Sequence, residues 1–540
     1  MKRLVLTLTA VLLCTCAAFA ADDDAHHHED VTPEQLGTVH FPTSCVIQVQ
    51  LQFERGVALL HSFWYEEAEK QFDQVIQQDP RCAMAHWGVA MSLWHELWNH
   101  PDRKTIKKGL VEVRKAEKLH STNDRERGYI SAIAAFYDGS RRRTYHDRAT
   151  AYTKVMEINY QRHPEDREGA AFYALALLAS APDRDTTFTN EKKAGAILEA
   201  LFAEEPNHPG IAHYLIHSYD SPQLAQLALP AARAYAKIAP TSPHALHMPS
   251  HIFARLGLWQ DDIASNLASI AATRKTAAMH MGGESHQFHA MDFLDYAYLQ
   301  SGRDADAQHL VDEIKAMPEM NDNMYGSDYD PRTYSLVAFS ARYALELHHW
   351  SDAASLPLIP GAAPGDNAIT YWARAIGAAR SGKPAEARED IAQIQVIYRT
   401  LVKQKKSEFA DYVDADRKEA EAWLAYAEGN HDQALKTIRI IAEKQEAEGD
   451  EPLAIPAREM LADMLVAMNQ PVPALAEYEN DLKFNPNRFD GLYGAAHAAE
   501  LAGSNTEATS YYAQLLKVCD GAASDRPELS KAKALVAKNN

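Results

Sequence analysis

The chain has 540 residues, of which 24% are charged and 46% hydrophobic, so it holds enough apolar side chains for a folded core. It is too long for one ordinary domain, unless the fold is a repeat array. A formal net charge of −20 argues against nucleic acid as a partner, because a phosphate-binding protein needs a basic face, whereas cationic ligands are compatible with it.

The first twenty residues have the pattern of a secretory signal peptide. Met1-Lys2-Arg3 supplies positive charge, Leu4–Leu13 is the apolar run, and Ala18-Phe19-Ala20 is a small-residue cleavage site. The apolar run is too short to span a bilayer, and no later stretch is apolar enough for a transmembrane segment. We therefore expect a periplasmic or secreted protein that begins near Ala21, with residues 21–40 as a flexible segment.

Histidines and cysteines near the N-terminus leave two alternatives open. Residues 22–30 hold three consecutive histidines in an acidic run, which we interpret as a disordered tail rather than a metal-collecting arm. Cys14 and Cys16 raise lipid attachment as an alternative to cleavage, but the residues before them suit it poorly. In the mature chain, Cys45 and Cys82 are about one repeat apart, so a disulfide could staple them in an oxidising compartment.

The first clear repeat begins near Val49. Gly56, Ala68, Phe72 and Pro80 fall at positions 8, 20, 24 and 32 of the tetratricopeptide (TPR) pattern, in which small residues let two helices approach closely. No useful strand alternation occurs anywhere, and further helices are expected in alternation. Their predicted ranges are 83–98, 105–119, 123–136, 145–162, 167–178 and 191–204.

The centre of the chain repeats with the 34-residue period of a TPR unit. His213 and His217 recur 34 residues later as His247 and His251. Beyond residues 360–365, a Pro- and Gly-rich hinge candidate, alanines fall in pairs at positions 8 and 20: Ala375 and Ala387, Ala422 and Ala434, Ala462 and Ala474, Ala496 and Ala508. We predict an all-α TPR helix–turn–helix solenoid, wound as a right-handed superhelix, with parts at 41–359 and 366–540 and a capping helix at 527–538.

The repeated histidines are candidates for a metal site. In a TPR superhelix, positions 2, 5 and 9 of each first helix face the concave groove, and residues three or four apart share one helix face. Imidazoles with a carboxylate suit zinc, copper or iron. The predicted ligands, at positions 5 and 9 of two units and at positions 2 and 5 of the next, are His213, His217, His247, His251, His289 and Asp292.

Other polar side chains are expected beside these ligands. His244 at position 2 is a candidate for binding a ligand or partner, and Tyr214 or Tyr296 for donating a proton. Pro249 lies between His247 and His251, and it either spoils their spacing or tilts His251 toward the others. The alternative is a polar groove that binds a peptide without metal.

A second group lies near the N-terminus. His61 and His95 share position 13 of their units, and Trp87 and Trp94 are close to them in the pattern. This aromatic lining suggests a ligand or peptide platform at one end of the groove, and aromatic core packing between the first helices is the alternative.

These stretches resemble a family of exported bacterial TPR-repeat proteins. The resemblance covers roughly residues 40–305 and implies the TPR superhelix, without an activity. It rests on Phe53–Val57 with Leu60-His61-Ser62-Phe63-Trp64, Cys82-Ala83-Met84-Ala85-His86-Trp87-Gly88, Asn207-His208-Pro209-Gly210, His244-x-x-His247-Met248-Pro249-Ser250-His251 and His289-Ala290-Met291-Asp292.

The sequence thus leads to three functional hypotheses. The first is an exported TPR scaffold that binds a protein or peptide partner and holds a transition metal in its groove. The second is a metal-dependent hydrolase or oxidase that uses the same ligands. The third is an interaction scaffold without metal.

Overall fold

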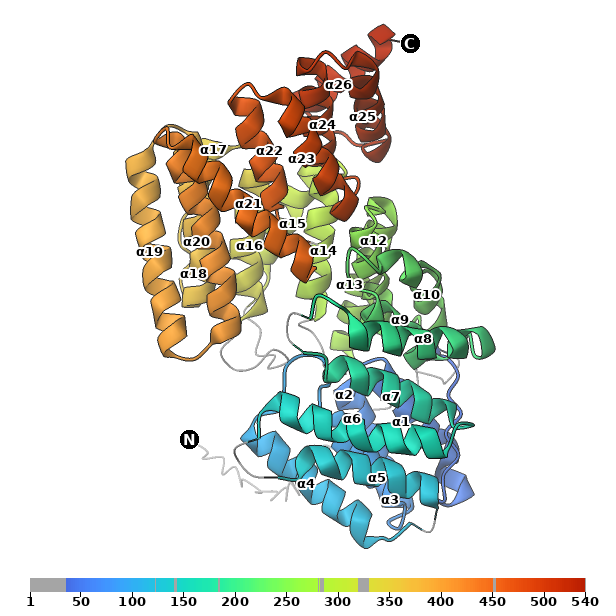
Figure 1. Ribbon diagram of the computed structural model, residues 1–540. Coiled ribbons are helices and arrows are strands. Elements are labelled where there is room, and N and C mark those ends of the chain that lie inside the picture. The colour runs from blue at the N-terminus through green and yellow to red at the C-terminus, as the bar shows by residue number, and fades with distance from the viewer. Residues whose placement is uncertain are drawn as a thin grey trace, which may run out of the picture.

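The protein is all-α, a solenoid of TPR-type helix pairs (Figure 1). The computed structural model describes residues 35–121, 123–139, 143–182, 185–279, 281, 286–318, 330–449 and 453–539. The predicted signal peptide, most of the segment 21–40 and the three consecutive histidines lie outside these residues. Within the described ranges, no helix combines the length and apolar character that crossing a membrane requires.

The helices of the N-terminal and central units follow one another in antiparallel pairs. They are α1 (Gln50–His61), α2 (Tyr65–Gln78), α3 (Ala83–Ser92), α4 (Arg103–Lys118), α5 (Asp124–Tyr137), α6 (Tyr145–Arg162), α7 (Arg167–Ala179), α8 (Thr189–Glu204), α9 (Pro209–Ser218), α10 (Ala225–Ile238), α11 (Pro243–His247), α12 (Pro249–Arg255), α13 (Trp259–Ala278), α14 (His286–Gln300) and α15 (Asp304–Ala316). A short 3-10 turn, η2 (Ile47–Val49), precedes them.

The C-terminal helices continue the array to the end of the chain. They are α16 (Pro331–Glu346), α17 (Trp350–Ala353), α18 (Pro364–Arg380), α19 (Pro384–Lys403), α20 (Ser407–Ala427), α21 (His431–Glu448), α22 (Ala457–Ala467), α23 (Pro471–Phe484), α24 (Phe489–Leu501), α25 (Asn505–Val518) and α26 (Pro527–Asn539). The last of these coincides with the predicted capping helix to within one residue.

Small residues at the predicted positions let the helices pack closely. A Cβ atom at Gly56 would lie 2.8 Å from the Phe72 ring, and one at Gly88 would lie 2.5 Å from it, so both glycines make room for the aromatic residue between repeats. The alanine pairs of the C-terminal units are buried as the pattern predicts.

One predicted helix is too long. The range 83–98 ends at Ser92 in the structure, because the segment that follows turns back on itself. Asn99 has a φ of +51°, and Pro101 disfavours helix in the residue before it. The segment between α3 and α4 is instead a loop that holds Trp94 and Trp98.

Two predicted boundaries also differ from the structure. Leu36 and Val39, inside the expected flexible segment, are buried, and the Thr38 N–H donates to the Asn207 carbonyl at 3.0 Å. The hinge candidate at 360–365 is the loop between α17 and α18, yet one core group includes Leu345 before it and Ile376 after it. Packing is therefore continuous across this loop.

The final units pack against the middle of the array rather than leaving it open. Trp259 Nε1 donates to the Asn487 carbonyl at 2.8 Å. The neighbouring Arg488 is fully buried, and its guanidinium pairs with Glu346 of α16 and Glu459 of α22. These contacts fix the C-terminal helices over α13 and α14.

Cys45 and Cys82 form a disulfide bond, with Cα atoms 4.8 Å apart. The bond joins the segment before α1 to the start of α3. It therefore ties the first two units together.

Candidate metal centre

Four neighbouring helices bring the repeated histidines together. α9 carries His213 and His217, α11 carries His244 and His247, α12 carries His251, and α14 carries His289. Pro249 does interrupt the helix, since α11 ends at His247 and α12 begins at the proline. The side chains on either side still meet, because His247 Nε2 and His251 Nε2 are 3.0 Å apart.

The histidines form two groups of three. In the first cluster, His213 Nε2 lies 3.0 Å from His244 Nε2 and 3.1 Å from His217 Nε2. The second cluster consists of His247, His251 and His289, whose ligand atoms all lie within 4.8 Å of one another. Two nitrogens bound at about 2.0–2.1 Å to one ion lie roughly 3.0–3.5 Å apart, so the close pairs have the spacing of ligands to a shared metal.

Hydrogen bonds on the opposite side of the rings determine which nitrogens face inward. His213 Nδ1 donates to the His61 carbonyl at 2.6 Å, and His251 Nδ1 donates to the Asp220 carboxylate at 2.8 Å. Neither acceptor can donate, so both Nδ1 atoms carry the proton. In a neutral imidazole, the Nε2 atom then presents a lone pair.

His247 is held in the same tautomer. Its Nδ1 lies 2.7 Å from Asn266 Oδ1. The Asn266 amide is oriented by its own donation to the Asp262 backbone carbonyl at 3.1 Å, so its oxygen must face the histidine. In the second cluster, two Nε2 lone pairs therefore point at each other across 3.0 Å.

Burial disfavours the protonated form of five of these imidazoles. Burial, together with the neighbouring His251, lowers the pKa of His217 and of His289 to about 3. Burial likewise puts the pKa values of His213, His244 and His247 well below the usual range, with neighbouring histidines adding to the effect. Asp220 is the nearby fixed charge: burial opposes its ionisation, but Arg255 and His251 hold its pKa below the usual range.

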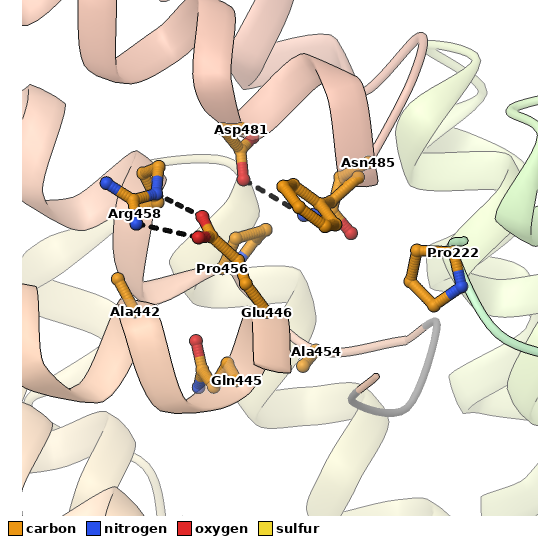
Figure 2. A pocket seen from close by; sticks show the side chains of 10 residues that line it. Pro222, Ala442, Gln445, Glu446, Ala454, Pro456, Arg458, Asp481 and Asn485 are labelled. Carbon is orange, nitrogen blue, oxygen red and sulfur yellow. Dashed lines mark hydrogen bonds and ion pairs between the residues drawn. The ribbon is translucent and has the colours of Figure 1, made fainter. Parts of the chain in front are cut away.

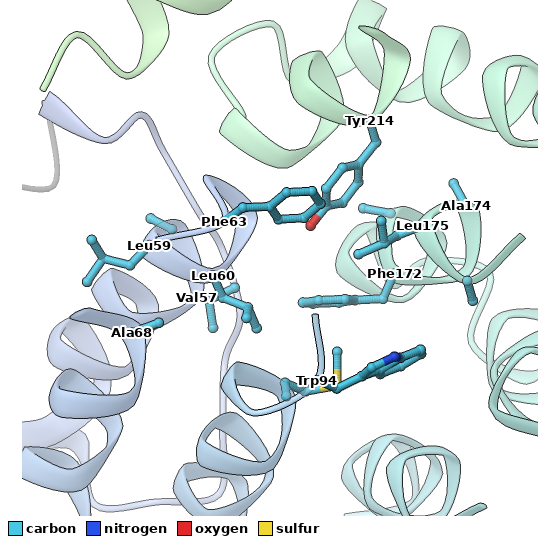
Figure 3. Packing of buried hydrophobic residues seen from close by; sticks show 14 of the residues in the cluster. Val57, Leu59, Leu60, Phe63, Ala68, Trp94, Phe172, Ala174, Leu175 and Tyr214 are labelled. Atoms are coloured by element: carbon cyan, nitrogen blue, oxygen red, sulfur yellow. The ribbon is translucent and has the colours of Figure 1, made fainter. Parts of the chain in front are cut away.

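Aromatic rings cover both clusters. The Phe63 ring centroid lies 4.4 Å from that of His213, and Trp98 lies 5.6 Å from His217 and His244. Phe293 lies 4.5 Å from His251. Phe63 extends from the end of α1 toward Tyr214 of α9, as Figure 3 shows.

A third group of buried histidines is saturated by hydrogen bonds. His61 Nε2 and His208 Nε2 contact the two oxygens of Glu168 at 2.8 and 2.9 Å. His61 Nδ1 pairs with the Tyr214 hydroxyl at 2.8 Å, and the Ile211 N–H donates to His208 Nδ1. Burial opposes ionisation of Glu168, yet the two histidines keep its pKa below the usual range. His61, predicted to line a platform for a ligand or peptide, and Tyr214, a candidate proton donor, are thus engaged inside this network.

Other predicted site residues lie apart from the clusters. The carboxylate of Asp292, a predicted ligand, pairs with Arg342 at 2.8 Å, and this buried guanidinium turns it away from the histidines. The Tyr296 hydroxyl accepts from Arg488 at 2.6 Å. Trp87 and Trp94 are fully buried in aromatic packing, and His95 stacks on Tyr65 with ring centroids 4.3 Å apart. The platform expected at the end of the groove is therefore core packing.

Several residues of this region have no signal in the repeat pattern. Asp220 follows α9 in a loop, and Asn266 lies on α13, the partner helix of the repeat. Phe63 occupies position 15 of its unit, where the pattern expects glycine, and has the corresponding φ of +51°. His208, by contrast, belongs to the Asn-His-Pro-Gly motif that carries the family resemblance.

A cleft lies where the C-terminal units meet the central ones. Pro222, two residues from Asp220, forms one wall, and α21–α23 form the other (Figure 2). Its lining mixes apolar side chains with polar ones that pair with each other: Glu446 pairs with Arg458, and Asp481 accepts from Asn485 at 2.9 Å. Its other lining residues are Ala442, Gln445, Ala454, Pro456 and Phe484.

Comparisons with known proteins place the chain only at low similarity. No family model matches it, and no curated protein does. The human IFIT1 dimer with m7Gppp-AAAA is 14% identical over 81% of this chain and 90% of that chain, with a TM-score of 0.33. A monomeric IFIT1 mutant with Gppp-AAAA is 12% identical over the same shares, with a TM-score of 0.35. A likeness at this level does not bear on the ligand or activity of this chain.

Proposed function

We propose that the protein is an exported helical-repeat scaffold that holds transition-metal ions in the two histidine clusters. The observation that carries the proposal is the pair of Nε2 atoms of His247 and His251, 3.0 Å apart, each with its proton held on the far nitrogen. Two facing lone pairs repel each other, and a shared cation removes the repulsion. Metal-bound histidines commonly donate their other N–H to a carboxylate or carbonyl, as these do.

The expected location follows from the sequence and from the disulfide. The N-terminal pattern is that of a signal peptide, and the Cys45–Cys82 bond suits an oxidising compartment. The cleft near Asp220 supports the scaffold role, because its lining combines apolar side chains with charged and amide groups, a mixture that suits a peptide partner. Metal and partner would then bind at neighbouring places.

The test is elemental analysis of the mature protein purified without a histidine tag. Wild type is compared with His247→Ala/His251→Ala, and helicity is measured by circular dichroism. We expect an ion in each cluster of the wild type and loss of the ion of the second cluster alone in the variant, with helicity intact. No metal in either protein, even after incubation with zinc, copper and iron, would leave a metal-free scaffold.

Two control variants separate the clusters from other histidines. His309→Ala/His349→Ala removes two histidines outside the clusters, and the exchange of His26, His27 and His28 for alanine removes the N-terminal run. Both should keep the metal. Loss of the metal in the N-terminal variant alone would place the binding in that run and contradict the proposal.

A metal-dependent enzyme is the second candidate. Three imidazoles per ion leave a coordination position open, as in catalytic metal sites. His217, His251 and His289 are only partly buried, so each cluster has a side that small molecules can reach. Exogenous azide or cyanide should perturb the spectrum of a cobalt- or copper-loaded protein if that position is open, and should leave it unchanged if the ions are fully coordinated.

A further inference from the structure

The two clusters are neighbours on one short helix. His244 and His247 are three residues apart on α11, and each joins a different cluster. Their ring centroids are 6.3 Å apart, and those of His217 and His251 are 6.5 Å apart. Ions held in the two clusters would therefore be near neighbours.

The ligand chemistry selects among metals. Among the described residues, all members of both clusters are imidazoles, and no carboxylate joins them. Imidazole without carboxylate oxygen disfavours magnesium, calcium and manganese, and leaves copper, zinc, iron and nickel. A pair of ions such as zinc or iron in this setting would lack the anionic bridge that usually brings two dications together.

The charge of the ions narrows the choice of metal further. Two dications would place four positive charges in a buried site, and an uncompensated buried charge is costly. The nearest fixed anion, Asp220, is already paired with Arg255, with Nε and Oδ1 3.1 Å apart. Monovalent copper halves the charge to be compensated, which favours Cu(I) as the resting ion.

We infer that the two clusters form one dinuclear copper centre whose substrate is dioxygen, bound between the two ions. This inference rests on the metal-binding function proposed above. Each Cu(I) gives one electron, and dioxygen accepts both to become a bridging peroxide between two Cu(II) ions. The oxygen–oxygen σ bond remains, no proton enters or leaves, and the total charge of +2 is the same before and after. The buried site therefore accommodates the redox step without a new charge.

The surroundings suit this substrate. Phe63, Trp98 and Phe293 pack on the rings of the ligands and make an apolar wall that admits a neutral diatomic molecule. The imidazoles of His213, His247 and His251 donate hydrogen bonds to the His61 carbonyl, Asn266 and Asp220. These bonds hold the rings in place, so the ligands need little reorganisation between oxidation states.

The experiment loads the metal-free full chain with two equivalents of Cu(I) without oxygen and then adds oxygenated buffer. We expect a new near-ultraviolet charge-transfer absorbance of peroxide bound to Cu(II), together with an electron paramagnetic resonance spectrum that stays silent, because the two Cu(II) spins couple through the bridge. Removal of oxygen under vacuum should abolish the absorbance.

Two single variants test the need for both clusters. His217→Ala weakens the first cluster, and His289→Ala weakens the second; both residues are partly exposed, so the fold should survive, as circular dichroism would report. Each should bind one copper firmly, show no peroxide absorbance, and give the resonance of an isolated Cu(II) after exposure to air.

Three outcomes overturn the inference in distinguishable ways. Two bound copper ions that show separate Cu(II) resonances, or Cu(I) that does not react with oxygen, would end the dioxygen centre and leave the proposed metal function intact. Zinc that displaces Cu(I) from both clusters at equal concentration would end the choice of copper. A protein that binds no metal at all would overturn the proposed function itself.

Discussion

Two groups of buried histidines lie side by side in this molecule, and they differ in how their nitrogens are used. In the group around Glu168, His61 and His208 present their Nε2 atoms to its two carboxylate oxygens. The second cluster has no such anion between its rings: His247 and His251 turn lone pairs toward each other. One group is complete within the protein, and the other has two facing nitrogens that a bound cation would satisfy.

This difference suggests a criterion that distinguishes a structural histidine from a candidate metal ligand. In both groups a carboxylate accepts a hydrogen bond from a histidine ring: Glu168 from His61 in the first, and Asp220 from His251 in the second. The deciding feature is the place of the carboxylate: Glu168 lies between two rings, whereas Asp220 lies behind His251 and directs its free nitrogen inward. The predictions below test this contrast.

Removal of the central anion should have the largest effect. Glu168→Leu leaves two buried imidazole N–H groups without an acceptor, and breaking such a pair costs about 3–5 kcal/mol. We expect a corresponding fall in the free energy of unfolding by urea, with the metal content per folded protein unchanged. Glu204→Leu, which removes an exposed partner of Arg167, is the matched control and should change stability by less than about 1 kcal/mol. A folded Glu168→Leu protein without metal would show that the two groups are not separate.

The stability of the metal-free protein should depend on pH through the titration of the cluster histidines. The folded pKa of His217 and of His289 is about 3, while the unfolded value is near 6.5. Between these values the unfolded chain binds more protons, so stability is fully present above pH 6.5 and is lost as the pH falls. The two residues together make the free energy of unfolding change by about 2.7 kcal/mol per pH unit.

Thermal unfolding of chelator-treated protein between pH 5 and 6.5 measures this slope. The variant His217→Ala/His289→Ala should show a slope that is smaller by this amount, while His213, His244 and His247 keep their own contribution. Glu168 itself does not interfere in this window, because its lowered pKa means that its contribution is lost only below the unfolded value of about 4.5. Burial also lowers the pKa of His61, so this residue adds to the slope in the wild type and in the double variant alike. An unchanged slope in the double variant would show that these imidazoles are not the groups that titrate.

Asp220 bonds a proposed ligand rather than the ion itself, so its charge should change the metal affinity without being required for binding. Asp220→Asn keeps the shape of the side chain but removes the charge that fixes the His251 tautomer, and such changes cost about 10- to 100-fold in metal affinity. A competition titration with a chromophoric chelator gives the ratio. Asp261→Asn, which breaks an exposed pair with Arg233, should leave the affinity unchanged. Equal affinities in the wild type and both variants would argue that Asp220 only anchors Arg255.

The repeat period predicted most of what positions the centre. The 34-residue spacing of His213, His217, His247 and His251 was enough to place them on adjacent helices, and the paired alanines of the C-terminal half are buried as expected. A period fixes which face of a helix a residue occupies. It does not fix how neighbouring helices rotate, so His244 was assigned to partner binding although it completes the first cluster.

The repeat pattern missed other residues of the site for the same reason. Asp220 lies in a loop and Asn266 on a second helix of a repeat, where the groove positions give no guide. The return of the C-terminal units over α14 depends on contacts between residues more than 190 positions apart, such as Arg488 with Tyr296. No local pattern encodes that return, and it is why the inner surface of the central repeats is covered rather than open.

Asp292 tests whether the repeat register or the ion pair with Arg342 decides the role of a residue, and the expected effect is the smallest of those predicted. Its register predicts a ligand, but its carboxylate bonds Arg342, which also pairs with Asp295 at 2.7 Å. Asp292→Asn should therefore leave the metal content and affinity unchanged and lower the free energy of unfolding by about 1.5 kcal/mol, the loss of one charged hydrogen bond while the second partner remains. Elemental analysis beside urea unfolding measures both. A loss of metal with unchanged stability would mean that the carboxylate leaves Arg342 for the ion, and that the sequence register was the better guide.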